Sequence, residues 1–263
     1  MNKLYLKHRL VTSPAGVPLL NLRHRLSRFR YLRHPELALL REEETMIHTL
    51  IQRSVTPDSV CVDVGGHIGS ISDVFRRAAP GGRQVIVEAS PTKADWLRQA
   101  FPGAEVHQVA VSDSEGDVSF FENLDQSGFS SLRARDTRGR VQKIDVRCTT
   151  LDLLLKDLPR VDFIKIDVEG FEHSVVRGAQ EILRRHRPVM LFEAGAATDA
   201  DIDNEEYVRL FSLLTGPLDY EIRPVFGDIY GKAPISLEEF GAMRTYPFMA
   251  FNYVARPKQV SAA

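Results

Sequence analysis

The sequence has few cysteines and no long apolar run, and both absences exclude classes of protein. Its 263 residues include 2 cysteines, Cys61 and Cys148, which are too few for a disulfide framework and too far apart for a structural zinc site. We therefore expect buried thiols in a reducing compartment. No apolar run approaches the roughly 20 residues that cross a bilayer, and residues 1–10 lack a signal-peptide core. These features predict a soluble cytoplasmic protein without a transmembrane segment.

Acidic residues are missing from one part of the chain, although the net charge is −1 at pH 7. Residues 1–34 hold eight lysines and arginines and no acid, so all 35 acidic residues lie further along. Such a basic segment can pair with the acidic body, or it can bind phosphate, nucleic acid or an anionic membrane. Because the segment lacks the aromatic interleaving of a nucleic-acid surface, we favour pairing with the body.

Short apolar runs alternate with amphipathic stretches from residue 58 onward. This alternation is typical of an α/β fold with a doubly wound, mostly parallel sheet. A helical pattern at 35–54 precedes it, so we divide the chain into a basic segment with a capping helix at 1–57 and a main domain at 58–263. We expect strands at 60–64, 84–87, 105–111, 161–166, 188–192, 220–224 and 248–254, added strands at 118–121 and 141–147, and helices at 70–78, 92–100 (with Ser90 as N-cap), 171–185 and 205–214.

Ligands of such a sheet bind at the carboxyl ends of the strands, so the turns there are the candidate site. In the first turn, Gly65, Gly66 and Gly69 let the chain bend sharply and let backbone N–H groups approach a ligand. Their spacing, with His67 between them, is not the G-x-G-x-x-G of a dinucleotide site. Asp63 would also repel a pyrophosphate and attract an amino group. An NAD-dependent oxidoreductase is therefore disfavoured.

Glu88 ends the second expected strand, where an acid accepts both ribose hydroxyls of an adenosine. A ligand with a ribose, an amino acid moiety and no phosphate satisfies these features, and S-adenosylmethionine (SAM) is such a ligand. Asp113 follows the third strand, where the adenine would lie, although it could be an ordinary turn aspartate. The backbone from Ala110 to Ser112 would contact the adenine edge in either case.

Acidic residues gather after the fourth expected strand, in the stretch 163–172. Strand alternation puts Lys165, Asp167 and Glu169 on one side. Polar residues in a buried strand are costly unless they are partnered or functional. We expect Lys165 to be the partner of one of these acids.

The motifs together resemble the FkbM family of SAM-dependent methyltransferases over about half of the chain, residues 58–195. The resemblance implies a seven-stranded, Rossmann-like class I methyltransferase fold that methylates sugar or polyketide hydroxyls. It also implies that Asp63, Gly65 and Gly69 belong to the cofactor loop and that Glu88 is the ribose acid. The resembling stretches are 63–69, 88–91, 127–132, 150–152, 165–172, 177–179 and 192–193.

Three residues depart from the usual family pattern. Gly66 and His67 stand where alanine and asparagine are common, and Ala89 stands where proline is common. We keep all three among the expected cofactor-binding residues. His67 would hydrogen-bond the methionine carboxylate, or it would only begin the next helix.

Methyl transfer to an aliphatic hydroxyl asks for a general base, which is worth roughly 10²–10⁴-fold in rate. Asp167 is the first candidate and Glu169 the second, as base or in orienting the substrate. Both Glu169 and Glu172 could instead stabilise the start of the following helix. Asp167 and Glu193 could hold a divalent metal, which the spacing does not favour. The polar loop 123–132 is a candidate lid over the cofactor.

The sequence thus predicts a SAM-dependent O-methyltransferase that acts on a hydroxyl of a sugar, glycoside or polyketide-type natural product. Its partner would be a small hydroxylated acceptor. Two alternatives stay open: an inert binding or scaffold protein on this fold, and a nucleic-acid methyltransferase that uses the basic segment. The second lacks the Asn/Asp-Pro-Pro-aromatic stretch that grips a flipped base. His173 and His186 are expected on helix surfaces.

Overall fold

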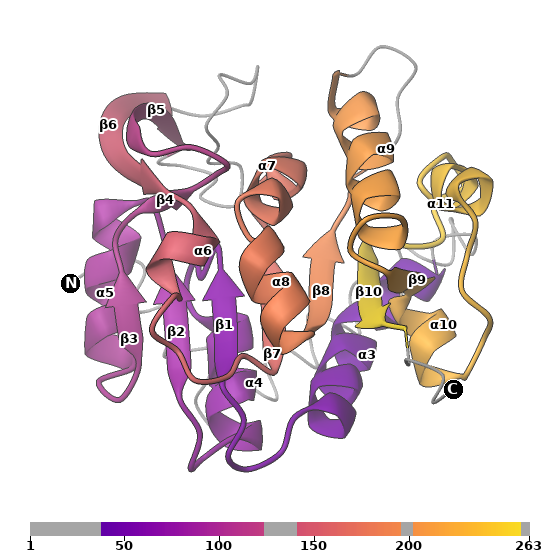
Figure 1. Ribbon diagram of the computed structural model, residues 1–263, viewed down its shortest axis with the longest axis horizontal. Coiled ribbons are helices and arrows are strands. Elements are labelled where there is room, and N and C mark those ends of the chain that lie inside the picture. The colour runs from indigo at the N-terminus through magenta and orange to yellow at the C-terminus, as the bar shows by residue number, and fades with distance from the viewer. Residues whose placement is uncertain (1–37, 124–140, 196–201, 259–263) are drawn as a thin grey trace.

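The computed structural model describes residues 38–123, 141–195 and 202–258, and its centre is a seven-stranded sheet (Figure 1). One strand runs antiparallel to both of its neighbours, and all other adjacent pairs are parallel. This confirms the doubly wound, mostly parallel sheet. In order across the sheet, the strands are β3 (Glu105–His107), β2 (Gln84–Val87), β1 (Cys61–Val64), β7 (Phe163–Ile166), β8 (Val189–Glu193), the antiparallel β10 (Asn252–Pro257) and β9 (Tyr220–Pro224).

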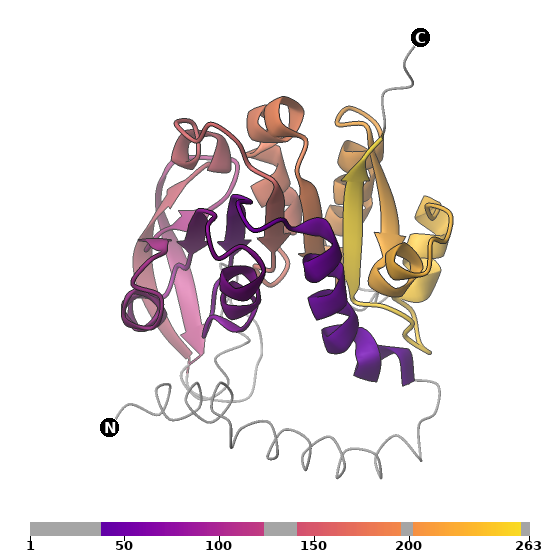
Figure 2. The same cartoon turned by 90° about the horizontal axis from the view of Figure 1, so that it is seen from below.

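Helices cover both faces of this sheet, because each face is apolar (Figure 2). Nowhere in the described ranges is a helix long and apolar enough to cross a membrane. One face packs against α3 (Ala38–Ser54), α4 (Ser70–Ala78), α5 (Pro91–Ala100) and α10 (Val225–Ile229). The other face packs against α6 (Leu151–Leu154), α7 (Glu172–Arg177), α8 (Gln180–His186), α9 (Ile202–Thr215) and α11 (Leu237–Met243).

The helix expected before the main domain is α3, which packs on the sheet as part of the core. Ile47, Leu50 and Ile51 of α3 join the cluster that contains Phe75 and Phe163. The buried carboxylate of its Glu43 accepts hydrogen bonds from the backbone N–H groups of residues 251 and 252 at the start of β10. The division of the chain at residue 57 stays a prediction, and the basic segment 1–34 lies outside the described residues.

A second sheet of three strands stands beside the carboxyl end of β2 (Figure 1). It consists of β4 (Ala110–Val111), β6 (Val141–Thr149) and β5 (Gly116–Asn123), in that order. The antiparallel pair β5–β6 confirms the two added strands. One expected strand at 105–111 is wrong, because β3 loses its partner after His107, which pairs with the last residue of β2. The chain then crosses to pair β4 with β6.

The single helix expected at 171–185 is also wrong, because it is interrupted between α7 and α8. Gly178 lies at the break, and a Cβ there would stand 2.1 Å from the backbone oxygen of Ser112. The chain therefore needs a glycine to pass residue 112 so closely. Two further differences lie near the C-terminus: the last strand begins at 252 rather than 248, and α10 and α11 were not expected.

Candidate active site

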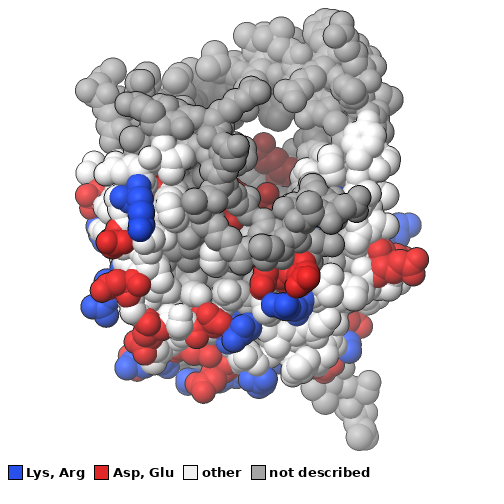
Figure 3. All heavy atoms as spheres, turned by 90° about the horizontal axis from the view of Figure 1, so that it is seen from above, with Lys and Arg blue, Asp and Glu red and all other residues white. Residues whose placement is uncertain are grey.

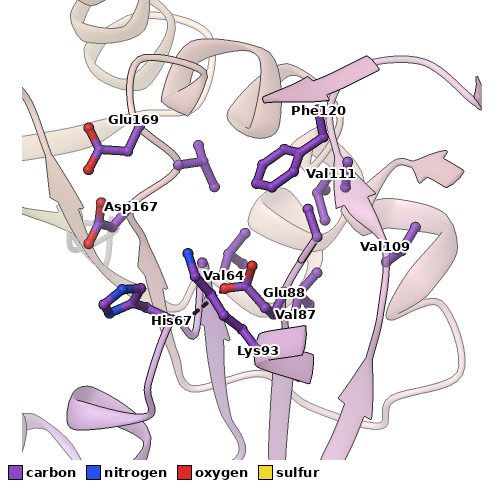
Figure 4. A pocket seen from close by; sticks show the side chains of 14 residues that line it. Val64, His67, Val87, Glu88, Lys93, Val109, Val111, Phe120, Asp167 and Glu169 are labelled. Atoms are coloured by element: carbon purple, nitrogen blue, oxygen red, sulfur yellow. Dashed lines mark hydrogen bonds between the residues drawn. The ribbon is translucent and has the colours of Figure 1, made fainter. Parts of the chain in front are cut away.

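A pocket opens at the carboxyl edge of the sheet, between the ends of β1, β2 and β7 and the small sheet (Figure 4). Seen from that edge, acidic side chains lie deep in the molecule (Figure 3). Carboxylates line one part of the pocket, and aliphatic and aromatic side chains line another. The lining residues are Val64, Gly65, His67, Val87, Glu88, Ala89, Lys93, Val109, Ala110, Val111, Phe120, Asp167, Val168 and Glu169.

The three glycines of the first turn serve two different purposes. Gly65 lines the pocket with a φ of 79°, and a Cβ there would stand 1.9 Å from the backbone oxygen of Asp167. Gly66 and Gly69 are not among the lining residues. A Cβ at Gly66 would stand 2.4 Å from Ile86, and one at Gly69 would stand 2.3 Å from Phe101. Gly66 and Gly69 therefore allow the turn to pack against β2 and α5, whereas Gly65 allows it to pass close to the backbone of Asp167.

Glu88 lies at the end of β2 with its carboxylate at the pocket wall. One of its oxygens accepts a hydrogen bond from the backbone N–H of His67 at 2.8 Å, and the other accepts one from the N–H of Ser90, also at 2.8 Å (Figure 4). Burial raises the pKa of Glu88, while the nearby Lys93 ammonium and these N–H donors act in the opposite direction. The acid is thus held in one orientation by the backbone that flanks it.

Asp63 and Lys165 form a buried ion pair beneath the glycine turn, outside the pocket lining. The Lys165 ammonium lies 3.6 Å from Asp63, 3.1 Å from Asp167 and 3.1 Å from the backbone oxygen of Gly65. Burial alone would lower the pKa of Lys165, but the charges of Asp167 and Asp63 outweigh burial and raise it. The expected pairing of Lys165 with an acid is confirmed. Asp63 also accepts a hydrogen bond from Ser72, so it supports the turn from below.

Asp167 and Glu169, the two candidate bases, both line the pocket. Asp167 directly follows the end of β7, and its side chain is 33% exposed, so an acceptor can reach it. Glu169 has a φ of 55° because the chain turns there, so it does not continue the alternation of the strand. In Figure 4 the two carboxylates lie across the cavity from Phe120. The structure therefore brings both candidates to one side of the pocket.

Two further acids lie behind Asp167, and both hold protons more tightly than usual. Burial raises the pKa of Glu172 to about 7, and its carboxylate accepts hydrogen bonds from the N–H groups of Val168 and Gly170. Burial, together with the charges of Asp167 and Glu169, raises the pKa of Glu193 to about 9. Glu172 therefore fixes the turn after β7, in line with the helix-start alternative, and Glu193 keeps its proton at neutral pH.

Of the residues expected around the adenine, Ala110 and Val111 line the pocket, but Ser112 and Asp113 do not; Ala89, expected elsewhere in the cofactor site, also lines it. Asp113 pairs with Arg177 of α7 at 3.0 Å, and Ser112 hydrogen-bonds Asp113. Both residues thus face the break between α7 and α8, because β4 turns the chain away from the pocket after Val111. For Asp113, the reading as an ordinary turn residue is the one that the geometry favours.

Sequence reasoning missed two prominent lining residues, Lys93 and Phe120. Lys93 lies in the first turn of α5, and its buried ammonium points into the cavity beside Glu88 (Figure 4). Phe120 comes from β5 in the small sheet. Its alternation with Val118 was visible in the sequence, but nothing in the sequence indicated that this sheet stands against the pocket.

Within the ranges that the structure describes, no three histidine, cysteine or acidic residues are grouped so that they could hold a metal ion. The suggested pair of Asp167 and Glu193 therefore gains no support as a metal site. The loop at 123–132 falls almost entirely on residues outside the described ranges.

The sequence of this chain matches the model of one known protein family. The model of the methyltransferase FkbM domain matches residues 63–244, which is more than half of the chain. The chain belongs to the FkbM methyltransferase family. The match begins at Asp63, at the glycine turn, and it extends beyond the half of the chain that carries the motifs.

Two proteins named as methyltransferases and one solved structure are similar to parts of this chain. Methyltransferase sdnD of Sordaria araneosa is 28% identical over 157 residues, covering 46% of this chain and 60% of that protein. Methyltransferase 1 of Beauveria bassiana is 23% identical over 148 residues, covering 47% and 59%. The chain thus spans about three fifths of the length of these relatives. A crystal structure of methyltransferase FkbM from Methylobacillus flagellatus is 18% identical with a TM-score of 0.46, covering 76% of this chain and 44% of that one.

The departures from the usual FkbM pattern have a simple physical basis at His67. Its φ is 50°, in the left-handed region where asparagine and histidine are both enriched. The bond to Glu88 comes from the backbone N–H, so it does not depend on the side chain. His67 lines the pocket, so its side chain is placed where a ligand could contact it and not only at the start of α4.

One expectation outside the pocket is wrong. His173 of α7 is buried, and its Nδ1 lies 2.6 Å from Glu206 of α9, so it joins two helices rather than facing solvent. The burial of His173 depends on Glu206, which is distant in the sequence, and the local pattern around His173 does not indicate such a partner.

Proposed function

We propose that this FkbM-family chain uses SAM to methylate a hydroxyl group of a sugar, glycoside or polyketide-type natural product. The observation that carries the proposal is that Glu88 and Asp167 line one pocket, at the ends of β2 and β7. An acid suited to a ribose and a carboxylate suited to an acceptor hydroxyl thus share a single cavity. The names of the two relatives, both methyltransferases, support the reaction class.

The residues of the pocket fit SAM in three respects. Its carboxylates, from Glu88, Asp167 and Glu169, suit a cationic sulfonium and would repel a pyrophosphate. Each oxygen of Glu88 already accepts one backbone hydrogen bond and keeps a lone pair for a ribose hydroxyl. Gly65 lines the cavity without a side chain, so only backbone atoms border the ligand space at that position.

When bound, SAM supplies an electrophilic methyl group on a sulfonium. The protein then has to align the acceptor oxygen with that methyl group, and such positioning is worth roughly 7–11 kcal/mol in well-oriented systems. Glu88 and the Gly65 turn would fix the nucleoside, and the carboxylates at 167 and 169 would fix the acceptor. As the new carbon–oxygen bond forms, the carbon–sulfur bond to the methyl group would break, its electron pair would stay on the sulfur of the departing S-adenosylhomocysteine, and the carboxylate of Asp167 would accept the hydroxyl proton.

Lys165 keeps the proposed base in place. Its ammonium bonds both Asp167 and the backbone oxygen of Gly65, so it ties the base to the cofactor turn. The side chain is buried, so these contacts are exchanged little with water. Lys165 is thus a positioning residue, which keeps the two halves of the pocket in register.

The direct test is calorimetric titration with S-adenosylhomocysteine (SAH), followed by a panel of hydroxylated acceptors with radiolabelled SAM. The proposal expects SAH binding and methyl transfer to a member of the panel. Absence of SAH binding would overturn it. Binding without transfer to any hydroxyl would favour a scaffold on this fold.

A further inference from the structure

We propose that the three-stranded sheet is part of the cofactor site, with Phe120 forming the wall against which the purine ring stacks. This deepens the function proposed above and depends on it. Phe120 is only 6% exposed, yet it lines the pocket, with its ring facing the cavity (Figure 4). A buried ring at a pocket wall offers a flat apolar face to a ligand.

The pocket is chemically two-sided, and Phe120 stands on the apolar side. Val109 and Val111 line the pocket on that side, and Ala110 packs in one cluster with Phe120, whereas Asp167 and Glu169 line the opposite side (Figure 4). A nucleoside has one apolar end, its base. With the ribose at Glu88, the base fits the apolar side and the charged sulfur the acidic side. The distribution of side chains therefore sets the direction in which the ligand lies.

The small sheet is anchored to the main domain by the same face that presents Phe120. Glu122 lies two residues further along β5, so it shares that face. Its buried carboxylate accepts a hydrogen bond from the Ser90 hydroxyl, and the Ser90 N–H donates to Glu88. The strand that carries the aromatic wall is thus joined through one serine to the ribose acid. This connection fixes the spacing between the two surfaces that a nucleoside would touch.

Apolar contacts hold the ring from behind. Phe120 packs in a small cluster with Ala110, Val146 and Cys148, and Val118 lies against that cluster without lining the pocket. Val118 therefore offers a matched control, because it shares the strand face and the cluster but not the cavity.

The first experiment is calorimetric titration of SAH into Phe120→Ala, Phe120→Tyr and Val118→Ala. Base–aromatic stacking is worth roughly 1–3 kcal/mol, so Phe120→Ala should weaken SAH binding about 5- to 100-fold. Phe120→Tyr and Val118→Ala should bind within about threefold of the parent. Equal affinity of Phe120→Ala and the parent would overturn the proposal. A parent that does not bind SAH would instead overturn the proposed function, and this assignment with it.

The second experiment detects contact directly and does not need the alanine variant to fold. The chain has one tryptophan, Trp96, which can be replaced by phenylalanine to remove its signal. In a Trp96→Phe/Phe120→Trp variant, SAH should quench the tryptophan emission by stacking, while the Trp96→Phe/Val118→Trp variant should change little. SAH binding to the first variant without any change in emission would exclude contact at position 120.

Discussion

The two sides of the pocket hold their carboxylates in contrasting ways. On the β2 side, one acid, Glu88, is buried and both of its oxygens are bonded to backbone N–H groups. On the β7 side, several acids gather about the single ammonium of Lys165. The first arrangement fixes one oxygen pair in space. The second creates a strongly charged surface whose members depend on one another.

This contrast teaches how one sheet edge can both bind and react. These hydrogen bonds cannot be lost without moving the glycine turn or the start of α5, so Glu88 is suited to hold a ligand in one place. The charges around Lys165 are coupled, because the negative charge of Asp167 contributes to the raised pKa of Glu193. In the proposed function, the β2 side would therefore be the binding half of the pocket, and the β7 side would be the half that takes the proton.

The largest effect is expected on the β7 side, from Asp167→Ala. Loss of a general base should lower turnover roughly 10²–10⁴-fold, while SAH affinity stays within about threefold, because the nucleoside contacts lie on the other side. Turnover is measured with the first acceptor found in the hydroxyl panel, and Glu169→Gln serves as the comparison. Undiminished turnover in Asp167→Ala would mean that the proton leaves by another route.

The next effect concerns the ammonium on which the β7 side depends. Lys165→Met leaves Asp63 and Asp167 without their cation, and breaking a buried pair typically costs about 3–5 kcal/mol of stability. Lys165→Arg keeps the charge and should lose less. Both are measured by urea unfolding at pH 7. If Lys165→Met were as stable as the parent, the acids of the β7 side would not depend on this cation.

On the β2 side, Glu88→Ala should act on binding. Hydrogen bonds to a charged group are worth roughly 1.5–3 kcal/mol, so SAH affinity should fall about 10- to 100-fold by calorimetry. The nearby Glu122→Gln keeps an oxygen for the Ser90 hydroxyl and should lose less affinity. Equal SAH affinity in Glu88→Ala and the parent would reject the division into a binding half and a reacting half.

Local sequence patterns were enough to predict the strand ends and the acids at them. The runs that end at Val64, Val87 and Ile166 are short and buried except at Gln84, and the residues that follow such parallel strands meet at one edge. The N-cap at Ser90 was likewise a local signal, and the Ser90 side chain accepts the expected backbone bond.

Features that depend on distant partners could not be predicted in this way. The break after Arg177 results from contact of Gly178 with residue 112, which is far away in the sequence. Phe120 reaches the pocket only because β4 leaves the main sheet and brings β5 and β6 beside β2. The sequence predicts ligand contacts at Gly66 and Gly69 as well, because a helix packed close to a turn requires the same residue as a ligand does.

The smallest effect per pH unit concerns the acids behind Asp167. An acid whose pKa is raised by folding keeps its proton where the unfolded chain has lost it, so stability falls as the pH rises towards the folded pKa. For Glu172 this window runs from its ordinary value of 4.5 to about 7, and for Glu193 from 4.5 to about 9. Each contributes a slope of at most about 1.4 kcal/mol per pH unit.

The free energy of unfolding in urea is therefore measured from pH 5 to 9. For Glu193→Gln it should fall less steeply with pH than for the parent over the whole range. For Glu172→Gln it should fall less steeply only below pH 7. The exposed Glu181→Gln is the control and should follow the parent, because other titrating groups cancel in the difference. If Glu193→Gln declined as steeply as the parent between pH 7 and 9, Glu193 would not hold a proton there. The β7 side would then carry one more negative charge at neutral pH, and its attraction for a cationic ligand would rise accordingly.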